Sequence, residues 1–559
     1  MWMRAALLAL CLATFVAGIG RSAIQDADEA YYAEAGREMV TSGDWITPHY
    51  NFEPRLQKPV FFYWLVAGTY RVVGVSEWAA RLWSALAGVG LAFLAFGVGR
   101  RWVNATVGLL AGVIVGTSFG LVPLARQSLP DVPLAFFITL TIWAGVEALA
   151  DAPANGATVR RGSWLLLSAF AMALGTLTKG PVAIALPGLV FAVLLVREWI
   201  GARRDGRSFA IRPSLGWWIA AAVLFLVVAV PWYVAVTRAQ GMGYLQQFFV
   251  GENVDRFATA RYNTWRGWRY VPIVIGGLLP WSVFGLFWIR PLRDVVTRRR
   301  RLSDVDARLV AWAFAPLAFF FVSVGSQPRY IVPCLVPLAV LLARTIARHA
   351  TGRGGVFAVA GATGGALIAV FGILLLRARP LLEAAGAGAA WTGALAIVAA
   401  GIVVIAVAWF VPRRVLVTII AVCAALALVI FERMVATTSR PAPVEVVGAI
   451  VRAHPEVSAA CACGAFGRSL NFYTHVKTVF AYDTERTDAD VVAFLRRPDP
   501  VLAAVDASLL PDVERTLGRT FPRLVEVNYL DTSVWQRPGD ALLEPDPSLV
   551  KRVVLISNK

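Results

Sequence analysis

The chain has 559 residues, of which 58% are hydrophobic and only 16% charged, and its mean hydropathy is +0.65. Soluble domains carry about a quarter charged residues, so this composition excludes a water-soluble fold of such length. The formal net charge is +18, but the residues from Ala436 onward hold 14 Lys or Arg against 15 Asp or Glu. The excess therefore lies in the apolar part, where basic residues act as topology signals, and we expect no nucleic-acid partner.

Apolar segments recur between residues 2 and 431, and each is long enough to cross a hydrocarbon core about 30 Å thick as a helix. The sequence therefore predicts an all-α polytopic membrane bundle over residues 1–435. About thirteen transmembrane helices are expected, and Lys179-Gly180-Pro181 divides two of them. The predicted spans are 3–20, 79–99, 103–122, 131–150, 163–178, 181–197, 216–236, 270–289, 308–325, 330–346, 356–376, 388–411 and 414–432.

The tail, residues 436–559, has a different pattern. Helix-like stretches alternate with strand-like stretches at 478–482, 501–505, 523–527 and 552–556. Such alternation predicts a soluble α/β domain.

Arginines indicate the orientation of the bundle. Arg4 precedes the first span, and Arg100-Arg101, Arg160-Arg161 and Arg413-Arg414 each follow an even-numbered one. These loops lie on one face, which the positive-inside rule makes cytoplasmic. An odd number of spans then puts the tail outside. For a bacterium, this means a multi-pass protein of the inner membrane with a periplasmic C-terminal domain.

Two external loops are unusually long. Residues 21–77 predict amphipathic helices at 28–40 and 59–73, the second rich in aromatic residues that suit a membrane interface. Residues 237–269 carry arginines on the side that the topology rule disfavours, so an anion outside the membrane is their expected partner. These arginines are Arg238, Arg256, Arg261, Arg266 and Arg269.

Ionisable residues at the rims of the spans converge on the external face and favour a single external cavity. The alternative to a functional role for any one of them is a solvated loop charge. Asp28 and Asp131 could also be acidic residues that the helix dipole favours at a helix N-terminus. Lys58-Pro59 and Lys179-Gly180-Pro181 each place a cation before a proline at a helix start, where a phosphate also meets free N–H groups. The converging residues are Asp28, Glu29, Lys58, Asp131, Lys179, Glu252, Arg256 and Arg329.

Several short motifs, each weak alone, occur in one order along the chain. They are Asp28-Glu29-x-x-Tyr32, Lys58-Pro59, Asp131, Leu177-Thr-Lys-Gly-Pro181, Pro231-Trp-Tyr233, Phe249-x-x-Glu252-Asn253-Val-x-Arg256-Phe, Leu279-Pro-Trp-Ser282 and Tyr330-Ile-Val-Pro333. With these motifs in this order, the sequence resembles the lipid-phosphate-sugar-dependent glycosyltransferases of the GT-C fold, and among them the bacterial aminoarabinose transferases. Two positions depart from that family's pattern: Ser326 replaces a usual lysine, and Arg261-Tyr-Asn-Thr-Trp-Arg266 replaces a histidine-containing stretch.

The resemblance implies transfer of 4-amino-4-deoxy-L-arabinose from undecaprenyl phosphate to a phosphate of lipid A. A departing phosphate needs cations and an oxocarbenium-like sugar needs a carboxylate. We therefore assign catalysis to Asp28 and Asp131 and donor-phosphate binding to Lys58, Arg256, Arg329 and Tyr330. Supporting residues are Glu29, Tyr31, Tyr32, Lys179, Glu252 and Asn253, and acceptor-binding residues are Arg261 and Arg266.

Other readings remain open at this stage. A protein O-mannosyltransferase would share the motifs, and a transporter would share a bundle with intramembrane charges, although no internal repeat is visible. A divalent metal is left open as a cofactor, held by Asp28, Glu29 and Asp131. Weaker candidates for a zinc ion are His49 with Glu53, or His475 in the tail, and the alternative for all of them is satisfied polar side chains. Expected partners are the undecaprenyl-phosphate-linked sugar, lipid A and membrane lipids, with the chain acting as a monomer.

Overall fold

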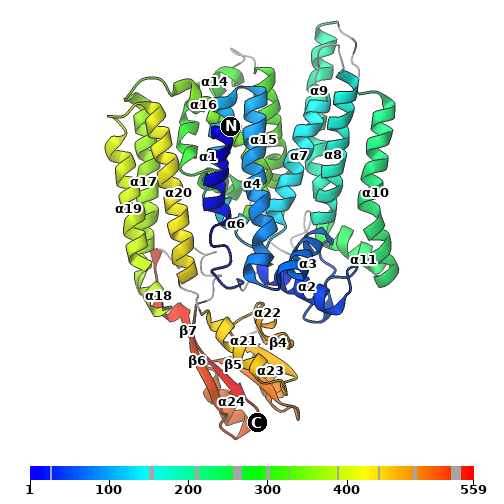
Figure 1. Ribbon diagram of the computed structural model, residues 1–559, viewed down its shortest axis with the longest axis vertical. Helices are drawn as coiled ribbons and strands as arrows, with labels where there is room; N and C mark the ends of the chain where they lie inside the picture. Colours follow the sequence, from blue (N-terminus) through cyan, green and yellow to red (C-terminus); the bar gives the residue numbers. More distant parts are fainter. Residues whose placement is uncertain are drawn as a thin grey trace.

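The computed structural model describes residues 1–25, 28–149, 157–206, 208, 213–255, 267–297, 302–324, 327–386, 390–437, 441–481, 487–530 and 543–559. Long helices run alongside one another as a bundle, here called the layer of helices, and a sheet-containing domain lies at one end of them (Figure 1). The helices of the layer are α1 (Trp2–Cys11), α4 (Glu77–Trp102), α5 (Ala105–Gly116), α7 (Asp131–Leu149), α8 (Ala157–Lys179), α9 (Val182–Arg204), α10 (Leu215–Gln240), α13 (Tyr270–Gly277), α14 (Ile289–Val296), α15 (Asp304–Val322), α16 (Val332–His349), α17 (Gly355–Arg377), α19 (Ala390–Val407) and α20 (Arg413–Thr437).

The predicted polytopic bundle is confirmed, and each predicted span coincides with a helix or a bent pair of helices. Among the described residues, eight helices are long and apolar enough to cross a membrane. A ninth span results if the pair Gly267–Gly277 and Trp281–Val296, bent by 113°, is counted as one. The apolar helices Trp2–Val16, Ala105–Gly116 and Trp391–Val407 are shorter. Length and composition alone therefore give fewer spans than the thirteen expected.

Polar caps and small residues shape the bundle. Ser76 and Asn104 accept N–H bonds from the first turns of α4 and α5, which start these helices. Between the same two helices, a Cβ on Gly108 would lie 2.6 Å from the carbonyl oxygen of Phe96. The absence of a side chain thus lets the two backbones approach closely.

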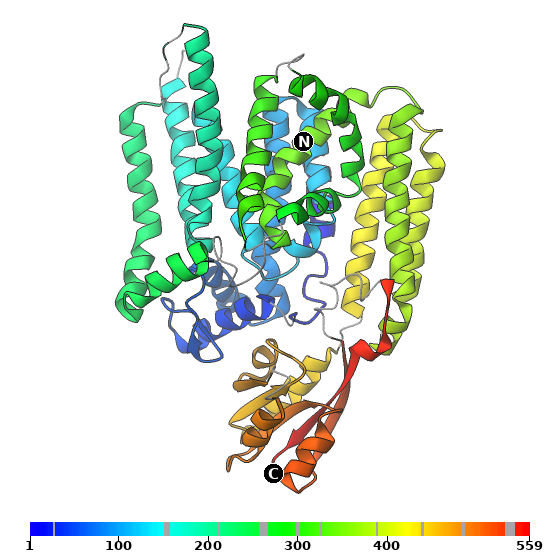
Figure 2. The ribbon, with the colours of Figure 1, turned by 180° about the vertical axis from the view of Figure 1, so that it is seen from behind.

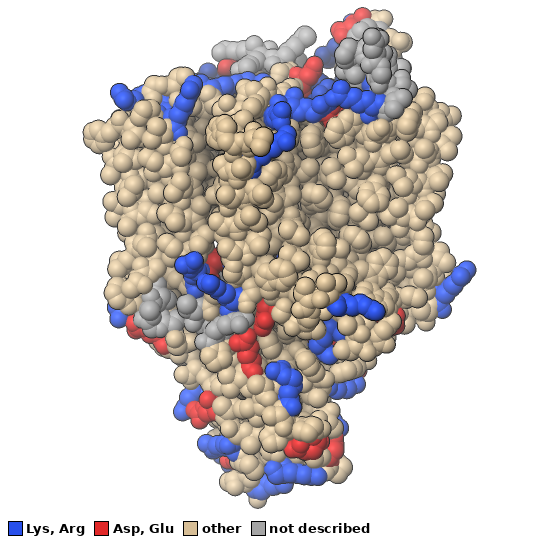
Figure 3. Space-filling view, in the orientation of Figure 1, with Lys and Arg blue, Asp and Glu red and all other residues tan. Residues whose placement is uncertain are grey.

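Lys and Arg side chains form a band along the end of the bundle that is opposite the sheet domain (Figure 3). This distribution is the one that the positive-inside rule associates with a cytoplasmic face.

The C-terminal elements form an α/β domain, as predicted. Its five-stranded sheet has the order β4-β3-β5-β7-β6, in which β3 pairs in parallel with β4 and β5 while β7 runs antiparallel to both its neighbours. The predicted boundary after residue 435 falls in the last turn of α20. The elements are α21 (Pro443–Ala453), β3 (Ala459–Cys463), α22 (Leu470–Thr474), β4 (Lys477–Ala481), α23 (Thr487–Leu495), β5 (Val501–Asp506), α24 (Leu510–Leu517), β6 (Arg523–Leu530) and β7 (Val550–Ser557).

The first long loop forms a layer between the bundle and this domain (Figures 1 and 2). It contains α2 (Asp28–Ser42), the short hairpin β1 (His49–Tyr50) and β2 (Glu53–Pro54), and α3 (Phe61–Val73). Hydrogen bonds attach it to the C-terminal domain: Asn51 exchanges two bonds of 2.8 Å with the backbone of Thr478. The α/β domain is therefore docked on the loop by directional contacts.

Candidate active site

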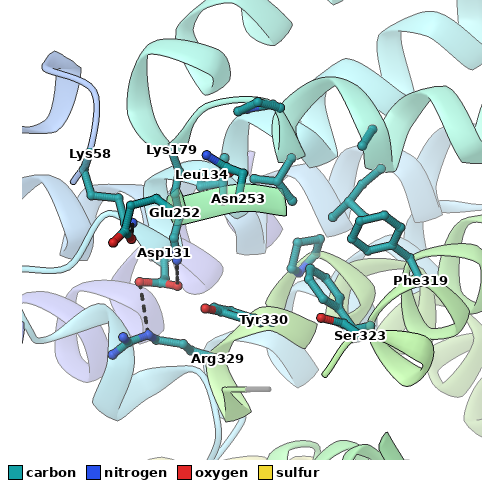
Figure 4. Close-up of a pocket in the computed structure, with 16 residues that line it drawn as sticks. Lys58, Asp131, Leu134, Lys179, Glu252, Asn253, Phe319, Ser323, Arg329 and Tyr330 are labelled. Carbon is teal, nitrogen blue, oxygen red and sulfur yellow. Dashed lines mark hydrogen bonds and ion pairs between the residues drawn. The ribbon is translucent and has the colours of Figure 1, made fainter. Parts of the chain in front are cut away.

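A cavity of about 300 Å³ opens where the bundle meets the loop layer. Charged and polar side chains reach it from distant parts of the chain: from the segment before α3, the start of α7, the end of α8, the helical segment η2 (Gln246–Val254) and the turn η5 (Pro328–Ile331). They point toward one another in Figure 4. The polar lining includes Lys58, Asp131, Lys179, Glu252, Asn253, Ser323, Arg329 and Tyr330, and apolar walls come from Leu134, Pro181, Val182, Ala185, Leu186, Phe319, Phe320 and Pro333.

Asp131 is the centre of the deepest charged group. Its Oδ1 lies 2.5 Å from Lys179 Nζ and its Oδ2 lies 3.4 Å from Arg329 Nε, while its side chain is only 5% exposed. The Lys179 ammonium also lies 4.9 Å from the ring centroid of Tyr330. Gly180, at φ +84°, turns the chain directly after this lysine. Buried charges are costly unless paired, so this group is a candidate for function.

Lys58 forms the second ion pair of the cavity. Its ammonium lies 2.9 Å from Glu252 Oε2 and donates to the carbonyl of Gln57 at the same distance. Asn253 lines the same wall, and its amide donates to the carbonyl of Phe248. The pairing links the first external loop to η2.

Asp28 lies at the rim and is linked to the deep group through Arg329, which pairs with both aspartates. A second guanidinium, from Arg468 in the C-terminal domain, lies 3.3 Å from Asp28 Oδ1. Burial tends to raise the pKa of Asp28, but Arg329, Arg468 and Arg55 outweigh it and hold the pKa below its ordinary value. Asp28 is therefore ionised at neutral pH.

The paired tyrosines of α2 lie in different surroundings. The Tyr31 ring lies under the Arg55 guanidinium, 3.8 Å from ring centroid to Cζ. Tyr32 is buried and packs against Phe62 and Tyr63. Tyr31 thus faces the charged rim, whereas Tyr32 belongs to the core of the loop layer.

Glu29 does not line the cavity, which corrects its predicted place among the substrate-site residues. Its carboxylate is buried and receives two bonds from Arg81, at 2.7 and 2.9 Å. The N–H groups of Gln25 and Ser128 donate to the same carboxylate. It therefore fastens the start of α2 to α4 and to the segment before α7.

Three predicted residues, Arg256, Arg261 and Arg266, lie outside the described part of the chain, so their phosphate-binding roles stay predictions. Ser326 also lies outside it.

The metal candidates gain no geometric support. Within the described ranges, no three His, Cys, Asp or Glu side chains are grouped to hold a metal ion. Glu53 instead pairs with Lys477, and His49 lies in β1 while His475 ends α22. In the other predicted metal site, Asp28 and Asp131 both form ion pairs with Arg329, and Glu29 forms an ion pair with Arg81.

Sequence reasoning missed two arginines at the rim, Arg55 and Arg468. Arg55 had a signal, because it stands three residues before Lys58 in the same external loop. Arg468 had none, since only the docking of the C-terminal domain brings it to Asp28.

Comparisons with known proteins agree with this architecture. Residues 3–240 match the family model described as dolichyl-phosphate-mannose-protein mannosyltransferase. The chain is 30% identical over 341 residues to the undecaprenyl phosphate-alpha-4-amino-4-deoxy-L-arabinose arabinosyl transferase of Enterobacter sp. (strain 638), covering 59% of this chain. It is 34% identical over 330 residues, or 58% of this chain, to the protein of that name from Pseudomonas aeruginosa (strain UCBPP-PA14). The matches span just over half of these relatives, 56% and 55% of their lengths.

Solved structures extend the likeness of fold to the whole chain. The crystal structure of ArnT from Cupriavidus metallidurans bound to undecaprenyl phosphate superposes with a TM-score of 0.73 at 23% identity, over 99% of this chain and 98% of that one. The archaeal oligosaccharyltransferase AglB from Archaeoglobus fulgidus superposes with a TM-score of 0.52 at 12% identity, over 98% of this chain and 71% of that one. The chain is therefore a multi-pass membrane protein with the GT-C fold. Its fold is similar to that of the ArnT structure, and the sequence matches agree with the resemblance seen in its motifs.

Proposed function

We propose that this protein is a glycosyltransferase that moves 4-amino-4-deoxy-L-arabinose from undecaprenyl phosphate to a phosphate of lipid A. The observation that carries the proposal is a cavity with apolar walls whose polar side places Lys179 and Arg329 on the carboxylate of Asp131 and Lys58 on that of Glu252. The similarity to the arabinosyl transferases supports the choice of sugar and donor.

The geometry accounts for the chemistry of such a transfer. The bond between the anomeric carbon and the donor phosphate oxygen breaks, and its electron pair leaves with the phosphate. Lys58, Lys179 and Arg329 stabilise the charge that develops there. Asp28, ionised at the rim, stabilises the positive charge on the sugar. An acceptor phosphate is already an anion, so its oxygen forms the new bond without a general base.

The apolar walls suit the prenyl chain of the donor, and the band of Lys and Arg at the opposite end suits a cytoplasmic face (Figure 3). We accordingly place the protein in a bacterial inner membrane, with cavity and C-terminal domain in the periplasm, acting as a monomer. Arg256, Arg261 and Arg266 extend the phosphate-binding set in this proposal.

The decisive experiment supplies purified protein with undecaprenyl-phosphate-aminoarabinose and lipid A. Mass spectrometry should detect lipid A that carries the added sugar, and wild-type protein that adds none would refute the assignment.

A protein O-mannosyltransferase is the second candidate, since the family model that matches residues 3–240 bears that description. Peptide and lipid A acceptors, offered in parallel with a mannosyl and an aminoarabinosyl donor, separate the two functions. Mannosylated peptide with unmodified lipid A would favour the second.

A further inference from the structure

The rim of the cavity beneath the C-terminal domain carries a cluster of cations that the proposed donor site does not use. Arg468 lies in the turn between β3 and α22, and its Nη1 is 3.3 Å from Asp28 Oδ1. Its guanidinium also lies 5.0 Å from the ring centroid of Tyr31. The hydroxyl of Tyr50 donates to the carbonyl oxygen of Arg468 at 2.9 Å and fixes the turn. The C-terminal domain thus presents an arginine to a predicted catalytic carboxylate.

Arg55 is the second cation of this cluster. Its guanidinium lies over the same Tyr31 ring, and its Nε donates to the Tyr63 hydroxyl at 3.1 Å. In the described part of the chain no carboxylate forms an ion pair with Arg55: its direct side-chain contacts are with tyrosines, and Asp28 acts on it only at longer range. Ring faces stabilise a guanidinium only partly, and removing a cation from water without an anionic partner is costly. Such a group is suited to receive an anion.

We infer that Arg468 and Arg55 form a phosphate-binding subsite beside Tyr31, and that its ligand is a phosphate of the lipid acceptor. This inference rests on the proposed function. Exposure separates it from the donor site: the side chains of Arg468 and Asp28 are 43% and 38% exposed, against 12% and 5% for Lys179 and Asp131. The phosphate of an acceptor headgroup at the membrane surface meets the exposed rim first, whereas a prenyl phosphate enters along the apolar walls.

The subsite gives the C-terminal domain a binding role beyond covering the cavity. Its docking contacts fix the position of the arginine, because the Tyr473 hydroxyl accepts the N–H of Ile24 at 2.8 Å and donates to Glu77 at 2.9 Å. An acceptor phosphate held by Arg468 would lie beside Asp28, next to the sugar that this carboxylate faces in the proposed reaction.

The test uses the full-length protein in detergent and three probes: undecaprenyl phosphate, lipid A with its phosphates, and dephosphorylated lipid A. The variants are R468A, R468K and the matched control R515A, which removes a 78%-exposed arginine of α24 that pairs with Asp512. We expect R468A to bind lipid A about tenfold more weakly, as for the loss of one charge-assisted contact. Its affinity for undecaprenyl phosphate and for dephosphorylated lipid A should equal that of the wild type. R468K should recover part of the loss, and R515A should behave as wild type.

Equal lipid A affinity in R468A and wild type would overturn the inference, and so would an equal loss for undecaprenyl phosphate, which would move Arg468 to the donor site. In transfer assays R468A should raise KM for lipid A while leaving KM for the donor unchanged. If the wild type binds as expected but transfers no aminoarabinose, the sugar assignment fails and the subsite stands. If the wild type transfers the sugar and R468A matches it in KM, only the subsite fails.

Discussion

Asp28 and Glu29 are neighbours in sequence, but the structure gives them opposite roles, and paired substitutions test this division. Glu29 is a fully buried carboxylate whose oxygens receive four hydrogen bonds, two of them from Arg81. Asp28 is a rim carboxylate, 38% exposed, that contacts two arginines. The changes Glu29→Gln and Asp28→Asn each remove one charge and keep the shape of the side chain.

For Glu29→Gln we expect a loss of about 3–5 kcal/mol in the free energy of unfolding, since Arg81 is left as a buried cation without its anion. The fraction that remains folded should keep a kcat close to wild type. For Asp28→Asn we expect at most about 1 kcal/mol in stability, because this carboxylate is 38% exposed and Arg329 keeps Asp131 as its partner. Its kcat should fall by about 10²–10³, the cost of removing one electrostatic stabiliser of a transition state.

Denaturant or thermal unfolding in detergent measures the first quantity, and sugar transfer per mole of folded protein measures the second. Normal stability with lost kcat in Glu29→Gln, or unfolding of Asp28→Asn, would refute the division. Full activity of Asp28→Asn in folded protein would remove Asp28 from the mechanism.

Three further changes test other parts of the site. Lys58→Ala should raise KM for the donor about 10-fold or more without unfolding the protein, measured by donor titration, and an unchanged KM would exclude phosphate binding there. Gly180→Ala places a Cβ 2.5 Å from Phe248 Cζ at a φ of +84°, so kcat/KM should fall as the turn shifts, while unchanged kcat/KM would show that the turn tolerates it. Burial of the Glu38 carboxyl in α2 and, to a smaller extent, the nearby charge of Glu34 raise its pKa. As the pH rises above the ordinary pKa of a glutamate, ionisation of Glu38 therefore lowers the stability of the fold. Glu38→Gln should therefore stabilise the protein at pH 9 more than at pH 5 in unfolding assays, and an equal effect at both would contradict this.

The sequence was sufficient for the bundle because hydrophobic length is a local property of each segment. The same holds for the break after Lys179, where Gly180 and Pro181 both disfavour helix continuation. The sequence did not predict the strand β3, Ala459–Cys463, because this central strand consists of alanine and cysteine and has no β-branched residue. Its two faces are buried because Ala460 and Ala462 pack in one hydrophobic cluster with α21 and α22, and Ala459, Cys461 and Cys463 in another with α23 and α24. Local composition does not reveal this packing.

The candidate site was predictable only as a set of charges on one face. The predicted topology placed Asp131, Lys179 and Arg329 on the same external face, and the structure brings them within ion-pair distance. Sequence could not separate Asp28 from Glu29, because their difference depends on Arg81, whose position in α4 is 52 residues away. Nor could it supply Arg468, 440 residues from Asp28, since that contact requires a docked domain.

The cavity and its rim pair most of their charges among themselves. Each carboxylate of the cavity and its rim neutralises a cation, so that the deep lysines are not left as unpaired charges in an apolar surrounding. The cations nevertheless outnumber the carboxylates by two among the described residues. This excess matches the charge of one phosphate dianion or two monoanionic phosphates, which would enter by exchange with existing pairs. The cations are Arg55, Lys58, Lys179, Arg329 and Arg468, and the carboxylates are Asp28, Asp131 and Glu252.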